Sequence, residues 1–439
     1  MLHAFANAFR TPDLRKKIFF TLFILAVFRL GSTIPVPNVN VQQVNMCRQF
    51  VTSGDNAASG LYSMIQLFSG GALLHLAIFA LGIMPYITSS IIMQLLAVVI
   101  PRLEALKKEG SSGTAKITQY TRYMTLVLAV LQATAFVTMA VNGQLFQGCP
   151  GASNILYSHD LWPIIVMVAT MTAGTGIIMW MGELITERGV GNGMSVMIFT
   201  QIAAHFPASL WAIKVMRPGA QGWFMFTIVL IIGLMVMAAV IYIEQAQRRI
   251  PVQYAKRMVG RRLVGGSTTY IPLKVNQAGV IPVIFASSIL YLPMLWTIFR
   301  PDSSVSRWLS TWFNHNGALY NASYFLLIIF FAYFYVSITF NPQEVSDNMK
   351  KYGGFIPGVR AGRPTERYLA YVLSRLTAPG ATYLGIIALV PTVAYALLGA
   401  AQNFPFGGTS ILIIVGVGLD TVKQIESQLQ QRNYEGFLK

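Results

Sequence analysis

Apolar segments alternate with short polar stretches along almost the whole chain. Ten of these segments approach the roughly 20 residues that a helix needs to cross a bilayer. They cover residues 18–37, 75–100, 123–141, 161–181, 193–213, 223–243, 279–299, 324–340, 372–398 and 407–422. The pattern predicts an all-α polytopic membrane protein with ten transmembrane helices.

A shorter apolar segment, residues 60–71, stands directly before the second of these spans. Its apolar residues recur three and four positions apart, which predicts a short amphipathic helix. The segment is too short to cross a bilayer. Its place at the start of a span therefore needs an explanation other than spanning.

The composition supports a membrane protein. Of the 439 residues, 54% are hydrophobic and only 11% are charged, whereas a soluble domain carries roughly 25% charged residues. The first apolar run lacks a small-residue cleavage site and follows Lys16 and Lys17. We therefore expect it to act as its own insertion signal and to remain as the first span.

Positive charge is distributed unevenly between the connecting segments. The net charge is +17, and most lysines and arginines fall in the N-terminus, the even-numbered loops and the tail. The odd-numbered loops hold only Arg48, Lys214, Arg217, Arg300 and Arg307. By the positive-inside rule both termini are cytoplasmic, and the regular alternation supports the count of ten.

Ten spans divide into two sets of five, which have opposite orientations if the halves are structurally related. Inverted repeats of this kind place a pathway at their interface. We expect a cytoplasmic N-terminus (1–17), an N-terminal half (18–213), a C-terminal half (214–422) and a cytoplasmic tail (423–439). The second half contains two long cytoplasmic loops, residues 244–275 and 342–371.

No motif for catalysis is present. The chain has neither a GxxxxGK[ST] phosphate loop nor an HExxH sequence, and its histidines and cysteines lack metal-ligand spacing. Coupled transporters and intramembrane enzymes need ionisable groups at membrane depth, but here nearly all charges lie at the ends of the spans, and Arg29, within the first span, is the exception. The sequence predicts a passive conduit that is not an enzyme, binds no cofactor or metal and depends on an outside motor.

The sixth loop carries a strand-like pattern. Apolar residues alternate with polar ones at Ile250, Val252 and Tyr254, and a glycine-containing turn region separates them from the sequence STTYIPLKV. This pattern predicts a β-hairpin that projects from the membrane. Its basic residues suit either a docking site for a partner or contact with anionic lipids.

The eighth loop combines glycine and proline with an arginine. The glycines and prolines between positions 353 and 364 predict an extended stretch, in which Arg360 lies between Val359 and Ala361. An arginine held out in this way suits a carboxylate or phosphate on a partner. An ordinary solvated loop is the alternative.

Several long motifs resemble the bacterial SecY family, the pore subunits of the Sec protein-conducting channel. They are IFALGIMPYITSSIIMQLL (78–96), GVGNGMSVMIF, RRIPVQYAKR, NQAGVIPVIFASSIL (276–290), YGGFIPGVRAGRPT and FGGTSILIIVGVGLD. The match keeps one order over nearly the whole chain. The resemblance implies two inverted five-helix halves around an hourglass pore in the bacterial plasma membrane.

The resemblance also implies three sets of residues at the pore. A plug helix that closes the pore from outside corresponds to Leu61, Tyr62, Met64, Ile65, Leu67, Phe68, Ser69, Gly70 and Gly71. A constriction ring corresponds to Ile83, Ile87, Met194, Ile198, Ile284, Leu292 and Ile413. A lateral gate toward lipid corresponds to Pro85, Thr88, Ser89, Ser287 and Ser288. An aliphatic ring excludes ions by dewetting, and a weakly held gate admits an apolar signal helix.

The resemblance implies partners as well. A docking set for the SecA motor ATPase and the ribosome, including its RNA, corresponds to Arg248, Arg249, Lys256, Arg257, Arg261, Arg262 and Arg360. The expected accessory subunits are SecE and SecG. The expected substrates are unfolded secretory proteins and membrane proteins.

Other functions remain open from the residues alone. A small-solute transporter lacks the intramembrane carboxylates that it would need, and an insertase without a pore would tolerate charges at Ile87 or Ile284. An enzyme is the weakest alternative, since no nucleophile–base pair or metal set is evident. Cys47 and Cys149 both lie on the predicted outer side, and the sequence leaves open whether they pair.

Overall fold

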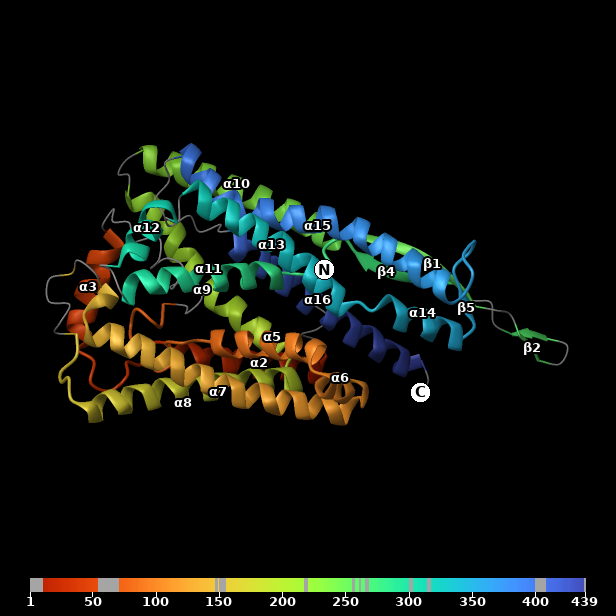
Figure 1. Ribbon diagram of the computed structural model, residues 1–439, viewed down its shortest axis with the longest axis horizontal. Coiled ribbons are helices and arrows are strands. Elements are labelled where there is room, and N and C mark those ends of the chain that lie inside the picture. The colour runs from red at the N-terminus through yellow and green to blue at the C-terminus, as the bar shows by residue number, and fades with distance from the viewer. Residues whose placement is uncertain are drawn as a thin grey trace. The chain divides into compact units, whose positions relative to one another are not determined.

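The computed structural model describes residues 11–53, 71–146, 149, 155–216, 220–254, 257–259, 262–264, 268–299, 303–313, 317–398 and 408–437 (Figure 1). The chain divides into two compact units. Unit 1 comprises Met1–Phe226, Ala400–Pro405 and Val417–Lys439, and unit 2 comprises Thr227–Gly399 and Phe406–Gly416.

Unit 1 is built almost entirely from helices. They are α2 (Pro12–Gly31), α3 (Val41–Ser53), α5 (Met84–Val99), α6 (Pro101–Lys108), α7 (Ser111–Val141), the 3-10 turn η1 (Gln144–Phe146), α8 (Leu161–Arg188) and α9 (Gly193–Met216). Helices α5, α7 and α8 pack in sequence order, and α2 packs against α8 (Figure 1). The end of α16 (Gly408–Phe437) also belongs to this unit.

Unit 2 combines apolar helices with short strands. Most of α10 (Ala220–Gln245) belongs to it, together with α11 (Ile281–Phe299), α12 (Ser304–Trp312), α13 (Ala318–Thr339), α14 (Pro342–Lys351) and α15 (Arg363–Leu398). The strands are β1 (Gln247–Tyr254), β2 (Arg257–Val259), β3 (Arg262–Val264), β4 (Thr268–Lys274) and β5 (Gly354–Phe355). Helix α13 packs between α11 and α15 (Figure 1).

Every one of the ten predicted spans overlaps one described helix. By length and apolar composition alone, six of the described helices suffice to cross a membrane, and the pair α5–α6, bent by 100°, makes a seventh if it counts as one span. Helix α2 carries basic residues at both ends, which lowers its apolar character. The polytopic helical architecture is thus confirmed, and the count of ten is consistent with it.

The second span departs from its prediction. Helix α5 begins only at Met84, whereas the prediction started a helical span at residue 75. Residues 71–83 form turns instead, with positive φ angles at Leu76 and Gly82. Backbone pairing outside the segment replaces the helical bonds, since the Val36 amide donates to Leu76 and the Ile78 amide donates to Ile34.

A glycine on α8 makes room for this irregular segment. A Cβ atom at Gly174 would overlap the carbonyl oxygen of Ile78. Gly176, two residues further along the same helix, is different, because the nearest atom to an added Cβ is a Leu126 methyl carbon 3.8 Å away. The close approach of α8 to residues 71–83 therefore depends on the missing side chain at position 174.

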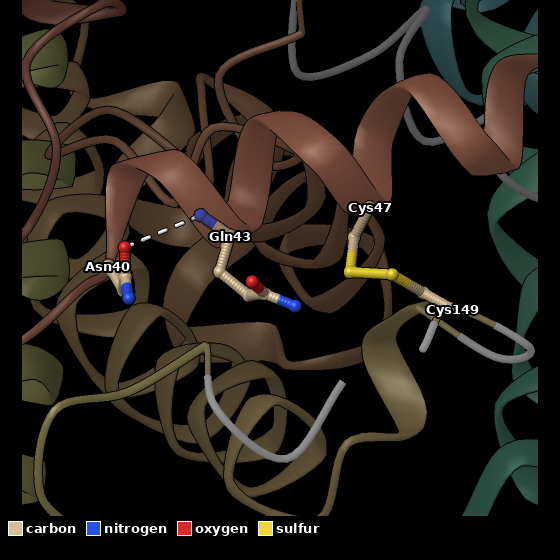
Figure 2. The surroundings of a disulfide bond; sticks show 4 residues. All are labelled: Asn40, Gln43, Cys47 and Cys149. Atoms are coloured by element: carbon tan, nitrogen blue, oxygen red, sulfur yellow. Dashed lines mark hydrogen bonds between the residues drawn. A yellow bond between two sulfur atoms is a disulfide. The ribbon is translucent and has the colours of Figure 1, made fainter. Parts of the chain in front are cut away.

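A disulfide joins two loops on the side predicted to be outer. Cys47 of α3 is fully buried and bonds to Cys149, with 5.4 Å between the Cα atoms (Figure 2). At the start of α3, the Asn40 side-chain oxygen accepts from the Gln43 amide at 3.3 Å. The Asn40 amide donates to Ile155, so the first outer loop is bonded to the second by backbone as well. The structure thus resolves the pairing that the sequence left open.

Substitution at Gly174 tests the close approach of α8. We expect Gly174→Ala to lower the free energy of unfolding by about 1–3 kcal/mol, because the new methyl group would displace the Ile78 backbone. Gly176→Ala should instead raise it by up to about 1 kcal/mol through helix propensity. Thermal or denaturant unfolding of the purified full chain measures both variants. Equal effects at the two positions would contradict the packing.

Candidate conduction and docking site

Four of the predicted ring residues meet in one apolar cluster of unit 1. Ile83, at the N-cap of α5, is 1% exposed, and Ile87 follows one helical turn later. Met194 and Ile198 lie one turn apart at the start of α9. The cluster packs all four side chains together with residues of α2 and α8. Segments more than a hundred residues apart therefore contribute to a single aliphatic surface.

Two glycines set the position of α9 within this surface. A Cβ at Gly193 would overlap the carbonyl oxygen of Gly182 on α8, and a Cβ at Gly182 would meet the Met194 sulfur. The first turn of α9 is therefore seated directly against α8. This contact determines where Met194 and Ile198 lie relative to Ile83.

Unit 2 contributes two further predicted ring residues. Ile284 on α11 is 7% exposed and Ile413 on α16 is 2% exposed. The two helices approach where a Cβ at Gly416 would lie 3.3 Å from the Val280 side chain. Ile413 precedes Gly416 by one turn and Ile284 follows Val280 by one turn. The side chain of Leu292 lies outside the described residues, as does the plug segment except for Gly71.

The predicted gate hydroxyls bond within their own units. Thr88 donates to the Met84 carbonyl in its own helix at 2.9 Å, and Ser89 donates to the Thr121 carbonyl of α7 at 2.8 Å. Ser287 donates to the Ile284 carbonyl at 2.9 Å. Pro85 lies in the first turn of α5, and the Ser288 side chain is outside the described residues. Ser89 thus joins α5 to α7.

The β-hairpin predicted in the sixth loop is present. Strands β1 and β4 pair antiparallel over seven residue pairs from Gln247–Lys274 to Gln253–Thr268. Ile250 and Val252 are buried, whereas Arg248 and Arg249 are exposed. A second pairing, β2 with β3, continues toward the tip and contains Arg257 and Arg262. Lys256 and Arg261 lie outside the described residues.

The sequence predicted two separate cytoplasmic loops, but the structure joins them. Strand β5 pairs with β1 at Gln253–Phe355 and Tyr254–Gly354, which gives a three-stranded sheet in the order β4-β1-β5. The buried face of this sheet shares an apolar cluster with Met349 of α14 and Leu369 of α15. The hairpin and the loop that carries Arg360 are therefore one packed body.

Hydrogen bonds hold the backbone at Arg360 and at Gly362. The Arg360 carbonyl accepts from the Thr365 hydroxyl at 2.8 Å, and the Gly362 carbonyl accepts from Ser346 at 2.8 Å. Val359 packs against the sheet cluster. Arg360 itself is exposed, so the fold presents its guanidinium from a fixed turn.

Two features of this body escaped sequence analysis. Helix α14 was not expected, although Asn341 before Pro342 is a start signal: the Asn341 side chain accepts from the Gln343 and Glu344 amides. Hydrogen bonds also link the segment after the hairpin to the end of α10. The buried Asn276 donates to Glu244 at the end of α10 and to the Gly279 carbonyl.

Comparison with known sequences agrees with these features. A family model described as SecY matches residues 77–422. Curated relatives described as protein translocase subunit SecY are 63% identical over 444 residues in Streptomyces scabiei and 56% identical over 450 residues in Mycobacterium bovis. Each alignment covers 100% of both chains.

Comparison with solved structures concerns the fold. A structure described as that of a protein conducting channel superposes with a TM-score of 0.62 at 17% identity, covering 94% of this chain and 91% of that one. Sec61 from a canine ribosome-channel complex of the endoplasmic reticulum has a TM-score of 0.57 at 17% identity, with the same coverage. The fold is that of the pore subunits of protein-conducting channels.

The chain belongs to the SecY family. Membership confirms the resemblance in the sequence motifs and the prediction of a channel subunit rather than an enzyme. Among the described residues, no group of three or more histidine, cysteine, aspartate or glutamate side chains could hold a metal ion.

Truncation of Ile250 tests whether the hairpin and the loop that carries Arg360 form one packed body. We expect Ile250→Ala to cost about 2–5 kcal/mol in the local free energy of opening, because it leaves a cavity in the shared cluster. Hydrogen exchange should accelerate in β1 and β4 and also in residues 354–362. Gln253→Ala, whose side chain is exposed, is the matched control. Faster exchange in the hairpin alone would contradict a joint body.

Proposed function

We propose that this chain forms the pore through which unfolded polypeptides cross the membrane. The observation that carries the proposal is the aliphatic cluster of unit 1, in which Ile83, Ile87, Met194 and Ile198 come together. In the proposed pore, Ile284, Leu292 and Ile413 of the other unit complete the ring. A ring of aliphatic side chains blocks ions by dewetting and deforms around a passing chain.

The plug and the gate are the further parts of this proposal. Residues 61–71 close the pore from outside at rest, and Gly71, with φ of 80°, supplies one hinge. The gate opens to lipid beside Pro85, Thr88, Ser89, Ser287 and Ser288, and releases apolar segments sideways. Specificity is then for hydrophobicity rather than for sequence.

Two independent features support an orientation with both termini in the cytoplasm of a bacterial plasma membrane. Lysine and arginine concentrate in the even-numbered loops. The Cys47–Cys149 disulfide lies in the odd-numbered loops, and disulfides persist in oxidising compartments outside the cytoplasm. We assign 1–17, 244–275, 342–371 and 423–439 to the cytoplasm and the five-span halves to residues 18–213 and 214–422.

The cytoplasmic body is the proposed docking surface. It presents Arg360 from a fixed turn, and Arg248 and Arg249 are exposed on the same body. We propose that this surface binds the SecA motor or the ribosome, and that SecE and SecG complete the channel. Contact with ribosomal RNA or anionic lipids through the basic residues would weaken with salt.

Crosslinking tests the conduit directly. A cysteine replaces Ile284, and a secretory precursor with its own cysteine is stalled part-way across in the presence of motor and ATP. The native cysteines are already paired. We expect a disulfide between precursor and position 284, because the chain passes the ring. Ile289→Cys, an exposed position on the same helix, should not react.

A precursor that engages the cytoplasmic body and never reaches position 284 would contradict the pore assignment. Equal crosslinking at positions 284 and 289 would also contradict it, since contact would then not be confined to the ring.

Charge reversal tests the docking surface. We expect Arg360→Glu to reduce motor-driven translocation to background, because it removes the guanidinium and repels an acidic partner. Lys351→Glu, an equal change of charge at an exposed position of α14, should retain most activity. Translocation into vesicles and unfolding of both variants are measured together. Normal translocation by Arg360→Glu would rule out a docking role for this arginine.

A further inference from the structure

The nine-residue helix α12 is held close to the membrane surface. It lies between α11, which ends at Phe299, and α13, which begins at Ala318 and is apolar and long enough to span. Four residues precede α12 and five follow it. A link of this length reaches at most roughly 18 Å when fully extended, so α12 stays beside the outer end of the span.

One face of α12 packs on its own unit. Ser306 is buried and Leu309 is half-buried on this face. Phe313, which follows the helix at the same spacing, packs edge-on against Tyr320 of α13 with 5.6 Å between ring centroids. Positions three and four apart share a helix face, so this face is occupied by protein.

A second apolar face is left open. Val305 and Trp308 are each 54% exposed, although both are large apolar residues. Helical geometry places them roughly a quarter-turn from the face that packs on unit 2. A further quarter-turn on, Ser304, Arg307 and Thr311 are exposed and polar. The helix therefore has three distinct faces: toward protein, apolar and open, and polar.

We infer that α12 lies in the lipid–water interface on the outer side of the membrane. It contacts the boundary between lipid headgroups and acyl chains through Val305 and Trp308. Tryptophan is enriched at this depth because its ring is apolar and its N–H is polar. An amphipathic helix that lies in the interface buries its apolar face and keeps its polar face in water. The three faces of α12 match protein, lipid and water in that order.

Another protein fits the open face less well. A stable interface between proteins buries about 800 Å² on each partner and involves roughly 20–30 residues per side. The open stripe contributes two large apolar side chains among the described residues, beside a polar face. Lipid needs no minimum area, and it is within reach because the adjoining α13 is apolar and long enough to span the membrane.

The test uses fluorescent labels at matched positions of the full chain in proteoliposomes. Trp308→Cys and Thr311→Cys each receive an environment-sensitive fluorophore, and the native cysteines remain paired. Val305→Cys provides a second label on the apolar stripe with Trp308 intact. Quenching is compared between a nitroxide on a shallow acyl carbon of phosphatidylcholine and a water-soluble nitroxide.

We expect lipid nitroxide to quench the labels at 305 and 308 several-fold more than the label at 311, and the aqueous nitroxide to give the reverse order. Equal aqueous quenching at 308 and 311 would overturn the inference, because the helix would then stand in water. Shielding of 305 and 308 from both quenchers would also overturn it, because a protein would then cover the stripe. Neither result depends on whether the chain conducts polypeptides.

Discussion

Backbone hydrogen bonding in an apolar environment is the constraint on which the rest of this structure depends. An unpaired backbone group in hydrocarbon costs several kcal/mol, so spanning segments are helices unless protein surrounds them. Residues 71–83 depart from this rule. Nearly all of their side chains are buried, and their backbone pairs with residues 34–36. The close approach at Gly174 completes this enclosure on the side of α8.

Outside the membrane the same requirement is met differently. Water can bond to the backbone groups of an unpaired strand edge, so a hairpin can form after α10 ends. Within the hairpin, β1 pairs with β4 on one side, and its other side is available for a further strand. Strand β5 uses that side. Two residues of pairing and one shared apolar cluster then join loops whose paired residues are at least a hundred positions apart in sequence. The exposed arginines of both loops, Arg248, Arg249 and Arg360, consequently belong to one packed body.

The sequence predicted what depends on local periodicity and charge. The helices and the hairpin follow from apolar spacing and alternation, whereas the aliphatic ring positions came only from the resemblance to the SecY family and stay a prediction. The predicted start of α5 was wrong because residues 71–83 are as apolar as the spanning helix that follows them. Their irregular fold depends on contacts with residues near position 34 and with Gly174, which are distant in sequence. Strand β5 is too short to have a pattern of its own. The Cys47–Cys149 pairing needed the packing of α3 beside η1, which no spacing in the chain reveals.

The proposed ring shows how backbone irregularity and aliphatic chemistry work together. Ile83 follows Gly82, whose positive φ ends the irregular segment and sets the first turn of α5. Met194 is fixed by the contact between Gly182 and Gly193. Ile83 is therefore anchored in the core while Ile87, Met194 and Ile198 remain only partly buried. Such a surface offers no donor or acceptor to a passing backbone, so under the proposed function it holds no sequence tightly. A charged or catalytic group at this depth would bind the chain and hinder its passage, which accounts in physical terms for an interior with so few ionisable residues.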